Sequence, residues 1–111
     1  MFHGTSRQNA ENIKKMGFQR SADGMLGEGV YLSRDPLKAK GYGEIVLRCH
    51  VQPGKTKKID RQMHPLQRSW QSHGYDSAWV PASCGMVASG LTENCVYDPK
   101  RITVVGEHRC K

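Results

Sequence analysis

The sequence lacks any long apolar run. No stretch approaches the roughly 18 consecutive apolar residues that a membrane-spanning helix needs, and basic and acidic residues interrupt the opening segment where a signal peptide would have its apolar core. Acidic, Gln-rich or Ser-rich tracts, which favour disorder, are absent as well. We therefore expect one folded, soluble, cytoplasmic domain over residues 1–111, with no membrane as a partner.

The sequence also lacks a recognisable cysteine motif. Its four cysteines, Cys49, Cys84, Cys95 and Cys110, form no CxxC pair and follow no secretory signal. Tetrahedral zinc sites usually take two of their ligands from one tight knuckle, which this spacing does not provide. We expect reduced thiols and no metal site.

Acidic residues are scarce relative to basic ones. The chain has 17 Lys and Arg against 10 Asp and Glu, a net charge of +7, which attracts phosphate-bearing partners without choosing among them. The densest basic cluster contains Lys55, Lys57 and Lys58, and no aromatic residue is interleaved with it for base stacking. We therefore expect a solvated face there rather than a phosphate or nucleic-acid contact.

Short periodic segments predict an α+β fold with two short helices and a mostly antiparallel sheet. The first helix is expected over residues 6–16, with a capping box from Thr5 to Gln8 and a stop at Gly17. Asp35 and Pro36 start a second helix over residues 36–42. Besides a very short segment around His3, strands are expected at 30–32, 45–51, 56–59, 78–80, 94–97 and 102–105, with loops over 21–29 and 60–74.

Three residues in glycine-flanked or strand-like segments suggest a chemistry. His3, Tyr31 and Glu93 supply one imidazole, one aromatic ring and one carboxylate. A glycosidase generally needs two carboxylates, because its leaving group must be protonated while the sugar cation is stabilised. Nicotinamide leaves NAD as a neutral base, so one carboxylate that stabilises the ribose can suffice. Taken singly, each of the three residues is more often structural than functional.

The remaining features of the site extend the same hypothesis. The rings of Tyr31 and Tyr42 can form two walls around a cationic pyridinium, leaving the Tyr31 hydroxyl for a hydrogen bond. His3 offers a hydrogen-bonding group for a ribose hydroxyl, and Gly4 allows the backbone to approach a ligand amide closely. The sequence thus predicts a nicotinamide-nucleotide pocket.

These motifs resemble the catalytic core of poly(ADP-ribose) polymerases and their mono-ADP-ribosylating relatives. The resemblance rests on His3-Gly4-Thr5 and on residues 29–32, 38–42 and 93–98, and it covers nearly the whole chain. It implies an ADP-ribosyltransferase-like fold with NAD as substrate. By motif position, it implies catalytic roles for His3, Tyr31 and Glu93, and NAD-binding roles for His3, Gly4, Thr5, Tyr31, Ala39 and Tyr42.

A longer linear match is to the interferon-stimulated grass carp reovirus-induced gene two family of fish, which are small antiviral proteins with a polymerase-like domain. It runs through residues 17–27, 57–60, 73–81 and 84–87. The match implies an innate-immune, antiviral role. Members carry a short segment before the His-Gly-Thr motif, so we expect this chain to lack a short natural N-terminal segment.

Two departures from the large polymerases shape the expected activity. Ala39 stands where those enzymes place a serine that binds the nicotinamide amide, which weakens NAD binding by a hydrogen bond worth roughly 0.5–1.5 kcal/mol. The interval from Tyr42 to Glu93 is shorter than theirs, which argues against polymer extension. Three functions stay open: single ADP-ribose transfer to a protein or nucleic acid, catalytically inactive binding of NAD, ADP-ribose or a partner, and, least favoured, RNA 2′-phosphotransfer.

Overall fold

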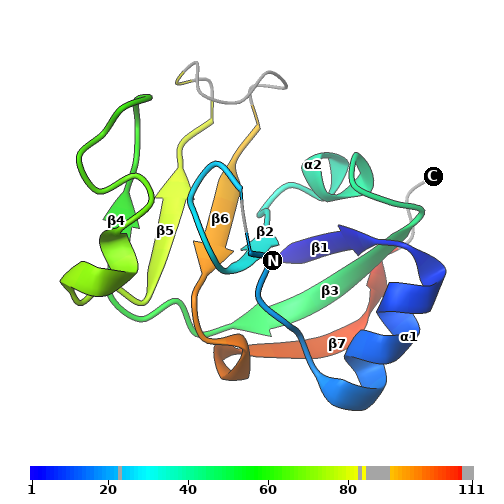
Figure 1. Ribbon diagram of the computed structural model, residues 1–111. Coiled ribbons are helices and arrows are strands. Elements are labelled where there is room, and N and C mark those ends of the chain that lie inside the picture. Colours follow the sequence, from blue (N-terminus) through cyan, green and yellow to red (C-terminus); the bar gives the residue numbers. More distant parts are fainter. Residues whose placement is uncertain (23, 83, 85–90, 109–111) are drawn as a thin grey trace.

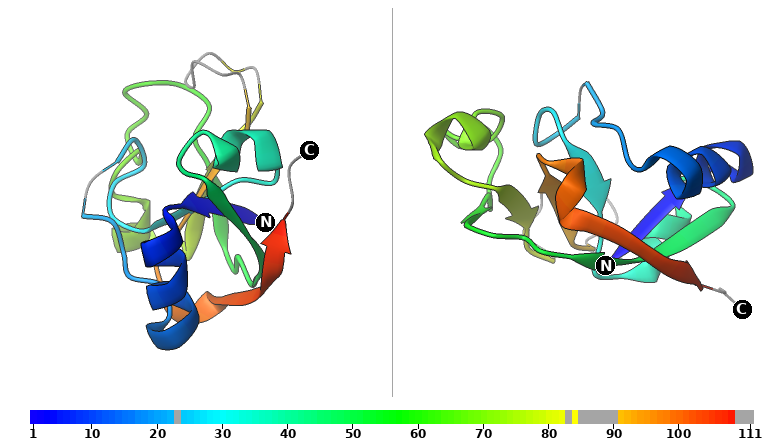
Figure 2. Two further views of the ribbon diagram at one scale, coloured as in Figure 1. Left: turned by 90° about the vertical axis from the view of Figure 1, so that its right-hand side faces the viewer. Right: turned by 90° about the horizontal axis from the view of Figure 1, so that it is seen from below.

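The described residues form an α+β fold built from two helices and two mostly antiparallel sheets (Figure 1). A computed structural model describes residues 1–22, 24–82, 84 and 91–108. The sheets lie side by side, with α1 (Arg7–Met16) beside the first sheet and the last strand of the second sheet at the opposite end of the molecule (Figures 1 and 2). The sequence predicted a single sheet, and this division into two is a correction.

The first sheet has the order β1-β3-β7 and is antiparallel throughout. Its strands are β1 (Phe2–Thr5), β3 (Ile45–Val51) and β7 (Ile102–His108). β3 lies in the centre and alternates between buried and exposed side chains along its second half, as its apolar periodicity predicted. β7 is three residues longer than expected, because residues 106–108 continue the ladder along β3 beyond a bulge between Arg48 and Cys49.

The second sheet has the order β2-β6-β5-β4. Its strands are β2 (Val30–Leu32), β6 (Glu93–Val96), β5 (Ser77–Val80) and β4 (Thr56–Lys58). β6 is antiparallel to both of its neighbours, whereas β4 runs parallel to β5. The connection between β4 and β5 contains the 3₁₀ turn η1 (Trp70–His73), within a segment that the sequence predicted to be a loop. Gly85 and Gly90, which from the sequence we expect to separate β5 from β6, lie outside the described residues.

Both helices begin at side-chain caps. Ser6 is the N-cap of α1 and accepts a hydrogen bond from the Asn9 backbone amide at 3.2 Å, so the cap lies one residue after Thr5, where the sequence predicted a capping box to begin. Asp35 caps α2 (Pro36–Lys40) as expected. α2 ends two residues earlier than predicted, and a second 3₁₀ turn, η2 (Pro99–Arg101), precedes β7.

Two hydrophobic clusters form the core and meet along β6. Leu47, Cys49 and Val96 belong to the cluster under the first sheet and α1, whereas Trp70 and Cys95 belong to the cluster under the second. Successive strand residues point to opposite faces, so the neighbours Cys95 and Val96 enter different clusters. Neither of the described helices has the length and apolar character needed to cross a bilayer.

Candidate functional site

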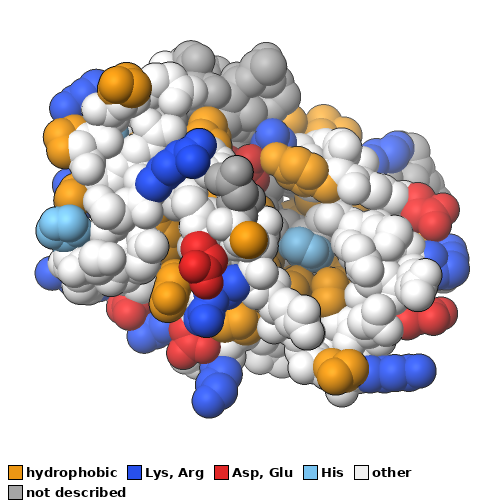
Figure 3. Space-filling model, in the orientation of Figure 1, with side chains coloured by type: hydrophobic (Ala, Val, Ile, Leu, Met, Phe, Trp, Pro, Cys, Tyr) orange, Lys and Arg blue, Asp and Glu red, His pale blue; other side chains and the backbone are white. Residues whose placement is uncertain are grey.

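A cleft of about 750 Å³ opens between β1, α1 and the chain that leads into β2. It faces the viewer in Figure 3, where hydrophobic and histidine side chains surround the hollow. α1 forms one wall, and Phe18 continues that wall after the helix ends. Of the residues expected from the sequence to bind NAD or act in catalysis, six line this cleft: His3, Gly4, Thr5, Tyr31, Tyr42 and Glu93.

His3 is held as a neutral imidazole at the cleft wall. Its Nδ1 lies 2.7 Å from the carbonyl oxygen of Tyr31, and because a carbonyl can only accept, Nδ1 carries the proton. Burial lowers the pKa of His3, although this backbone hydrogen bond opposes the effect. The ring also packs edge-on against Phe18 at 5.0 Å. Nε2 is thereby left as the acceptor, which suits a ligand hydroxyl.

Gly4 presents its backbone to the open edge of β1. The amide and carbonyl of Phe2 pair with Ser33 rather than with β3, and the same alternation turns those of Gly4 away from β3. A Cβ on Gly4 would overlap the carbonyl oxygen of Ala39 in α2. The glycine is therefore required by the contact with α2, a reason the sequence did not reveal.

Ala39, which the resemblance assigns to NAD binding, does not line the cleft as the other expected residues do. It is 1% exposed and packs at the contact with Gly4, and it is not among the described residues that line the cleft. The structure therefore places Ala39 behind the cleft wall.

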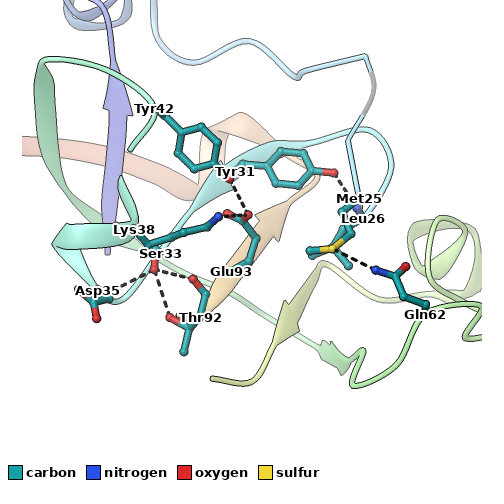
Figure 4. Close-up of polar contacts among 10 residues, drawn as sticks. All are labelled: Met25, Leu26, Tyr31, Ser33, Asp35, Lys38, Tyr42, Gln62, Thr92 and Glu93. Atoms are coloured by element: carbon teal, nitrogen blue, oxygen red, sulfur yellow. Dashed lines mark hydrogen bonds and ion pairs between the residues drawn. The ribbon is translucent and has the colours of Figure 1, made fainter. Parts of the chain in front are cut away.

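Glu93 is the most buried carboxylate of the cleft, with 4% of its surface exposed. Its Oε2 accepts a hydrogen bond from the Tyr42 hydroxyl at 2.8 Å and lies 3.5 Å from the Lys38 ammonium (Figure 4). Its Oε1 is buried and has no hydrogen-bond partner among the described residues. Burial raises the pKa of Glu93, and the contacts with Tyr42 and Lys38 oppose that rise.

Lys38 is a site residue to which the sequence assigned no role. Burial alone lowers the pKa of this ammonium, but its contacts with Tyr42 and Glu93 outweigh burial and hold the pKa above its ordinary value. The ammonium also lies 4.9 Å from the centre of the Tyr42 ring. A signal was available, because residues four apart on a helix share one face and Tyr42 follows Lys38 by four.

The ring of Tyr31 lines the cleft, whereas its hydroxyl contacts the loop that precedes β2. Its ring lines the cleft on the other side of Glu93 from Tyr42 (Figure 4). Its hydroxyl, expected to be available to a ligand, instead donates to the Gly27 carbonyl at 2.6 Å and accepts from the Leu26 amide at 2.9 Å. Tyr31 thereby fixes the loop over residues 24–27 against β2.

Comparison with protein-family models found no match, and neither did comparison with curated proteins. Among the described residues, no cluster of three or more His, Cys, Asp or Glu side chains could hold a metal ion. The features that a function must explain are therefore those of the cleft: a neutral histidine, two tyrosine rings, and a buried carboxylate with one unpaired oxygen.

Proposed function

We propose that the cleft binds NAD and transfers single ADP-ribose units to a protein or nucleic-acid acceptor. The observation that carries this proposal is the Glu93 carboxylate, whose Oε1 is buried and unpaired in a cleft that Tyr31 and Tyr42 also line. Leaving a buried acceptor unpaired costs about 1–3 kcal/mol, so such an atom fits a ligand that donates to it. A ribose hydroxyl is a donor of this kind.

The chemistry requires one carboxylate in this position. The bond between ribose C1′ and the nicotinamide nitrogen breaks, and its electron pair moves onto that nitrogen, which becomes neutral. Glu93 Oε1 accepts the ribose hydroxyl hydrogen bond and stabilises the positive charge that develops at C1′. A nucleophilic atom of the acceptor then bonds to C1′ and releases its proton to solvent.

The rest of the cleft supplies binding groups for such a substrate. The cleft volume of about 750 Å³ lies within the usual range for small-molecule sites. Two aromatic rings suit a cationic pyridinium, the backbone edge at Gly4 suits a carboxamide, and neutral His3 suits a ribose hydroxyl. Lys38 and Tyr42 hold Oε2 of Glu93, which orients the carboxylate and favours its charged form.

The motif resemblance extends this proposal to fold family and biology. An ADP-ribosyltransferase-like fold is compatible with the observed α+β architecture, in which β1, β2, β6 and the turn after α2 each contribute a residue of a matched motif to one cleft. On the same resemblance, we assign the protein to a cytoplasmic antiviral response of the kind attributed to the fish family. Single transfer is favoured over polymer formation by the short interval between Tyr42 and Glu93.

A second candidate is an inactive binding module with the same cleft. It is favoured by the occupation of Glu93 Oε2 by two neighbours, the Tyr42 hydroxyl and the Lys38 ammonium. In this candidate, NAD or ADP-ribose binds and no bond is broken.

Labelled NAD distinguishes the two candidates. We expect the wild type to transfer label to added protein or RNA, and Glu93→Gln, which keeps the side-chain size, to reduce transfer about 100-fold or more. NAD affinity measured by calorimetry should change much less. Glu11→Gln, which removes an exposed carboxylate from α1, is the matched control and should transfer like the wild type.

Three outcomes decide between the candidates. NAD binding without transfer by the wild type establishes the binding module. Transfer that persists in Glu93→Gln removes Glu93 from the chemistry. Neither binding nor transfer overturns both candidates.

A further inference from the structure

A second feature, far from the cleft, combines positive charge with aromatic rings. Lys55, Lys57 and Lys58 lie on or beside β4, the edge strand at the end of the molecule opposite α1 (Figure 1). The sequence around these lysines contains no aromatic residue, which predicted a solvated face. The fold adds aromatic rings from a distant part of the sequence, because the pairing of β4 with β5 brings Tyr75 and Trp79 close to these lysines.

Close contacts lie on both faces of this edge strand, because the neighbouring residues Lys57 and Lys58 point to opposite faces. We call these contacts together the basic-aromatic edge. The ammonium groups of Lys55 and Lys57 lie 4.9 and 5.6 Å from the centre of the Tyr75 ring. The Lys58 ammonium lies 5.9 Å from the Trp79 ring. Both rings are half-buried, so part of each remains accessible. Lys55, Lys57 and Tyr75 thus lie on one side of β4, and Lys58 and Trp79 lie on the other.

Acidic neighbours do not cancel this charge. Asp76 is the carboxylate nearest to Lys55 in the pairing of the two strands, and it is already engaged with Arg101 at 3.3 Å and with the Lys55 backbone amide at 2.9 Å. Asp60, after β4, lies 3.9 Å from Arg61. The basic side chains of the edge therefore outnumber its acidic ones.

Protection of an edge strand explains the lysines but not the rings. Charged lysines on an edge discourage pairing with another chain. Aromatic rings beneath them add accessible stacking surfaces, which edge protection does not need. A lysine ammonium interacts more strongly with a phosphate than with an aromatic ring. When a phosphate binds, the ammonium can therefore move off the ring, and the ring face becomes available for stacking with a base.

We propose that the edge formed by β4 and β5 binds single-stranded nucleic acid, with phosphates on the three lysines and bases on Tyr75 and Trp79. The combination of a cationic track with sequence-tolerant stacking platforms is the usual basis of such binding. The net charge of +7 assists association over longer distances. This binding needs neither NAD nor Glu93, so its outcome is separate from that of the proposed transfer activity.

The test uses the full chain without NAD and a fluorescein-labelled 12-nucleotide oligouridylate. We expect binding by fluorescence anisotropy, with affinity falling as salt rises. For single strands, each lost phosphate contact reduces the slope of log affinity against log salt by about 0.7. Lys57→Gln/Lys58→Gln should therefore reduce the slope by about 1.4. Arg7→Gln/Lys15→Gln on α1 removes the same charge from exposed positions and should leave the slope nearly unchanged.

Stacking has its own readout. Binding should quench tryptophan fluorescence in the wild type, and Trp79→Leu should abolish most of that quenching and weaken affinity by about 5-fold or more. Trp70 is fully buried and provides the constant background. The lysine variants keep the proposal testable if Trp79→Leu does not fold. Equal loss in the α1 control, equal binding of poly-glutamate, or unaltered binding in both edge variants would each overturn the proposal.

Discussion

Glu93 is a carboxylate whose surroundings act on its charge in opposite directions. Burial favours the neutral acid, whereas the Tyr42 hydroxyl and the Lys38 ammonium favour the carboxylate, and burial is the largest of these effects. The pKa is therefore raised. A carboxylate that is buried in this way and has no hydrogen-bond donor at Oε1 fits a site whose ligand supplies that donor.

The raised pKa of Glu93 predicts a specific dependence of stability on pH. The folded state binds this proton more tightly than the unfolded state does, so the contribution of Glu93 to stability is full below the unfolded pKa. It is lost as pH rises through the folded pKa. Glu93→Gln cannot lose that contribution, and its free energy of unfolding relative to wild type should therefore increase from pH 4 towards neutrality.

Urea denaturation at several pH values measures this difference. Lys38 stays protonated over this pH range. The loss of its carboxylate partner in Glu93→Gln therefore changes the free energy of unfolding by a constant amount and does not make that change depend on pH. Glu11→Gln, at an exposed position of α1, is the control. A difference between Glu93→Gln and wild type that stays flat or decreases with pH would contradict a raised pKa.

Residue order and residue type predicted six of the residues that line the cleft but not its internal contacts. His3, Tyr31, Tyr42 and Glu93 were recognisable because each is a reactive or aromatic residue in a distinctive motif. The pairing of the Tyr31 hydroxyl with the loop before it was not predicted, because residue type does not indicate which backbone groups a tyrosine hydroxyl will reach.

At the scale of elements, the position of α2 depends on a single missing side chain. Gly4 of β1 lies against the carbonyl of Ala39, and α2 carries Lys38 towards Glu93. Gly4→Ala should force α2 away and destabilise the fold by about 1–3 kcal/mol, the usual cost of overpacking. Chemical denaturation measures this loss.

Gly41→Ala is the matched control for Gly4→Ala. Gly41 has helical backbone angles, with φ of −64° and ψ of −16°, and a Cβ there would lie 3.3 Å from the Lys38 carbonyl oxygen. Its effect should stay near zero or be slightly stabilising. Similar losses at both positions would show that the contact between β1 and α2 is not tightly packed.

The sequence predicted the positions of helices and strands better than it predicted which strands pair with one another. The cap at Asp35, the capping residues at the start of α1 and the alternation along β3 are local signals, and these elements lie where expected within a few residues, although the cap of α1 is Ser6 rather than Thr5. The separation into two sheets and the parallel pairing of β4 with β5 depend on contacts distant in sequence. That pairing also creates the basic-aromatic edge, which is why the sequence around Lys57 predicted only a solvated face.

At the scale of the whole molecule, β6 links two cores that would otherwise be separate. Val96 packs in the cluster of the first sheet, and the adjacent Cys95 packs in the cluster of the second. Phe2 and Ser33 add a backbone bridge between β1 and the end of β2. Loss of either cluster should therefore remove support from the other, and the cleft lies where the two meet.

This coupling predicts that a substitution in one cluster lowers the stability reported by the other. Leu47 is fully buried in the first cluster, and Leu47→Ala should cost about 2–5 kcal/mol. Both tryptophans lie on the other side, Trp70 in the second cluster and Trp79 on β5, so tryptophan fluorescence follows the second sheet. In Leu47→Ala, the fluorescence transition should shift to lower temperature together with the far-ultraviolet circular dichroism transition.

Val105→Ala, at an exposed position of β7, is the control and should shift neither transition appreciably. A fluorescence midpoint that stays at its wild-type temperature while the circular dichroism midpoint falls would show two independent folding units, because coincident transitions are what a two-state molecule requires.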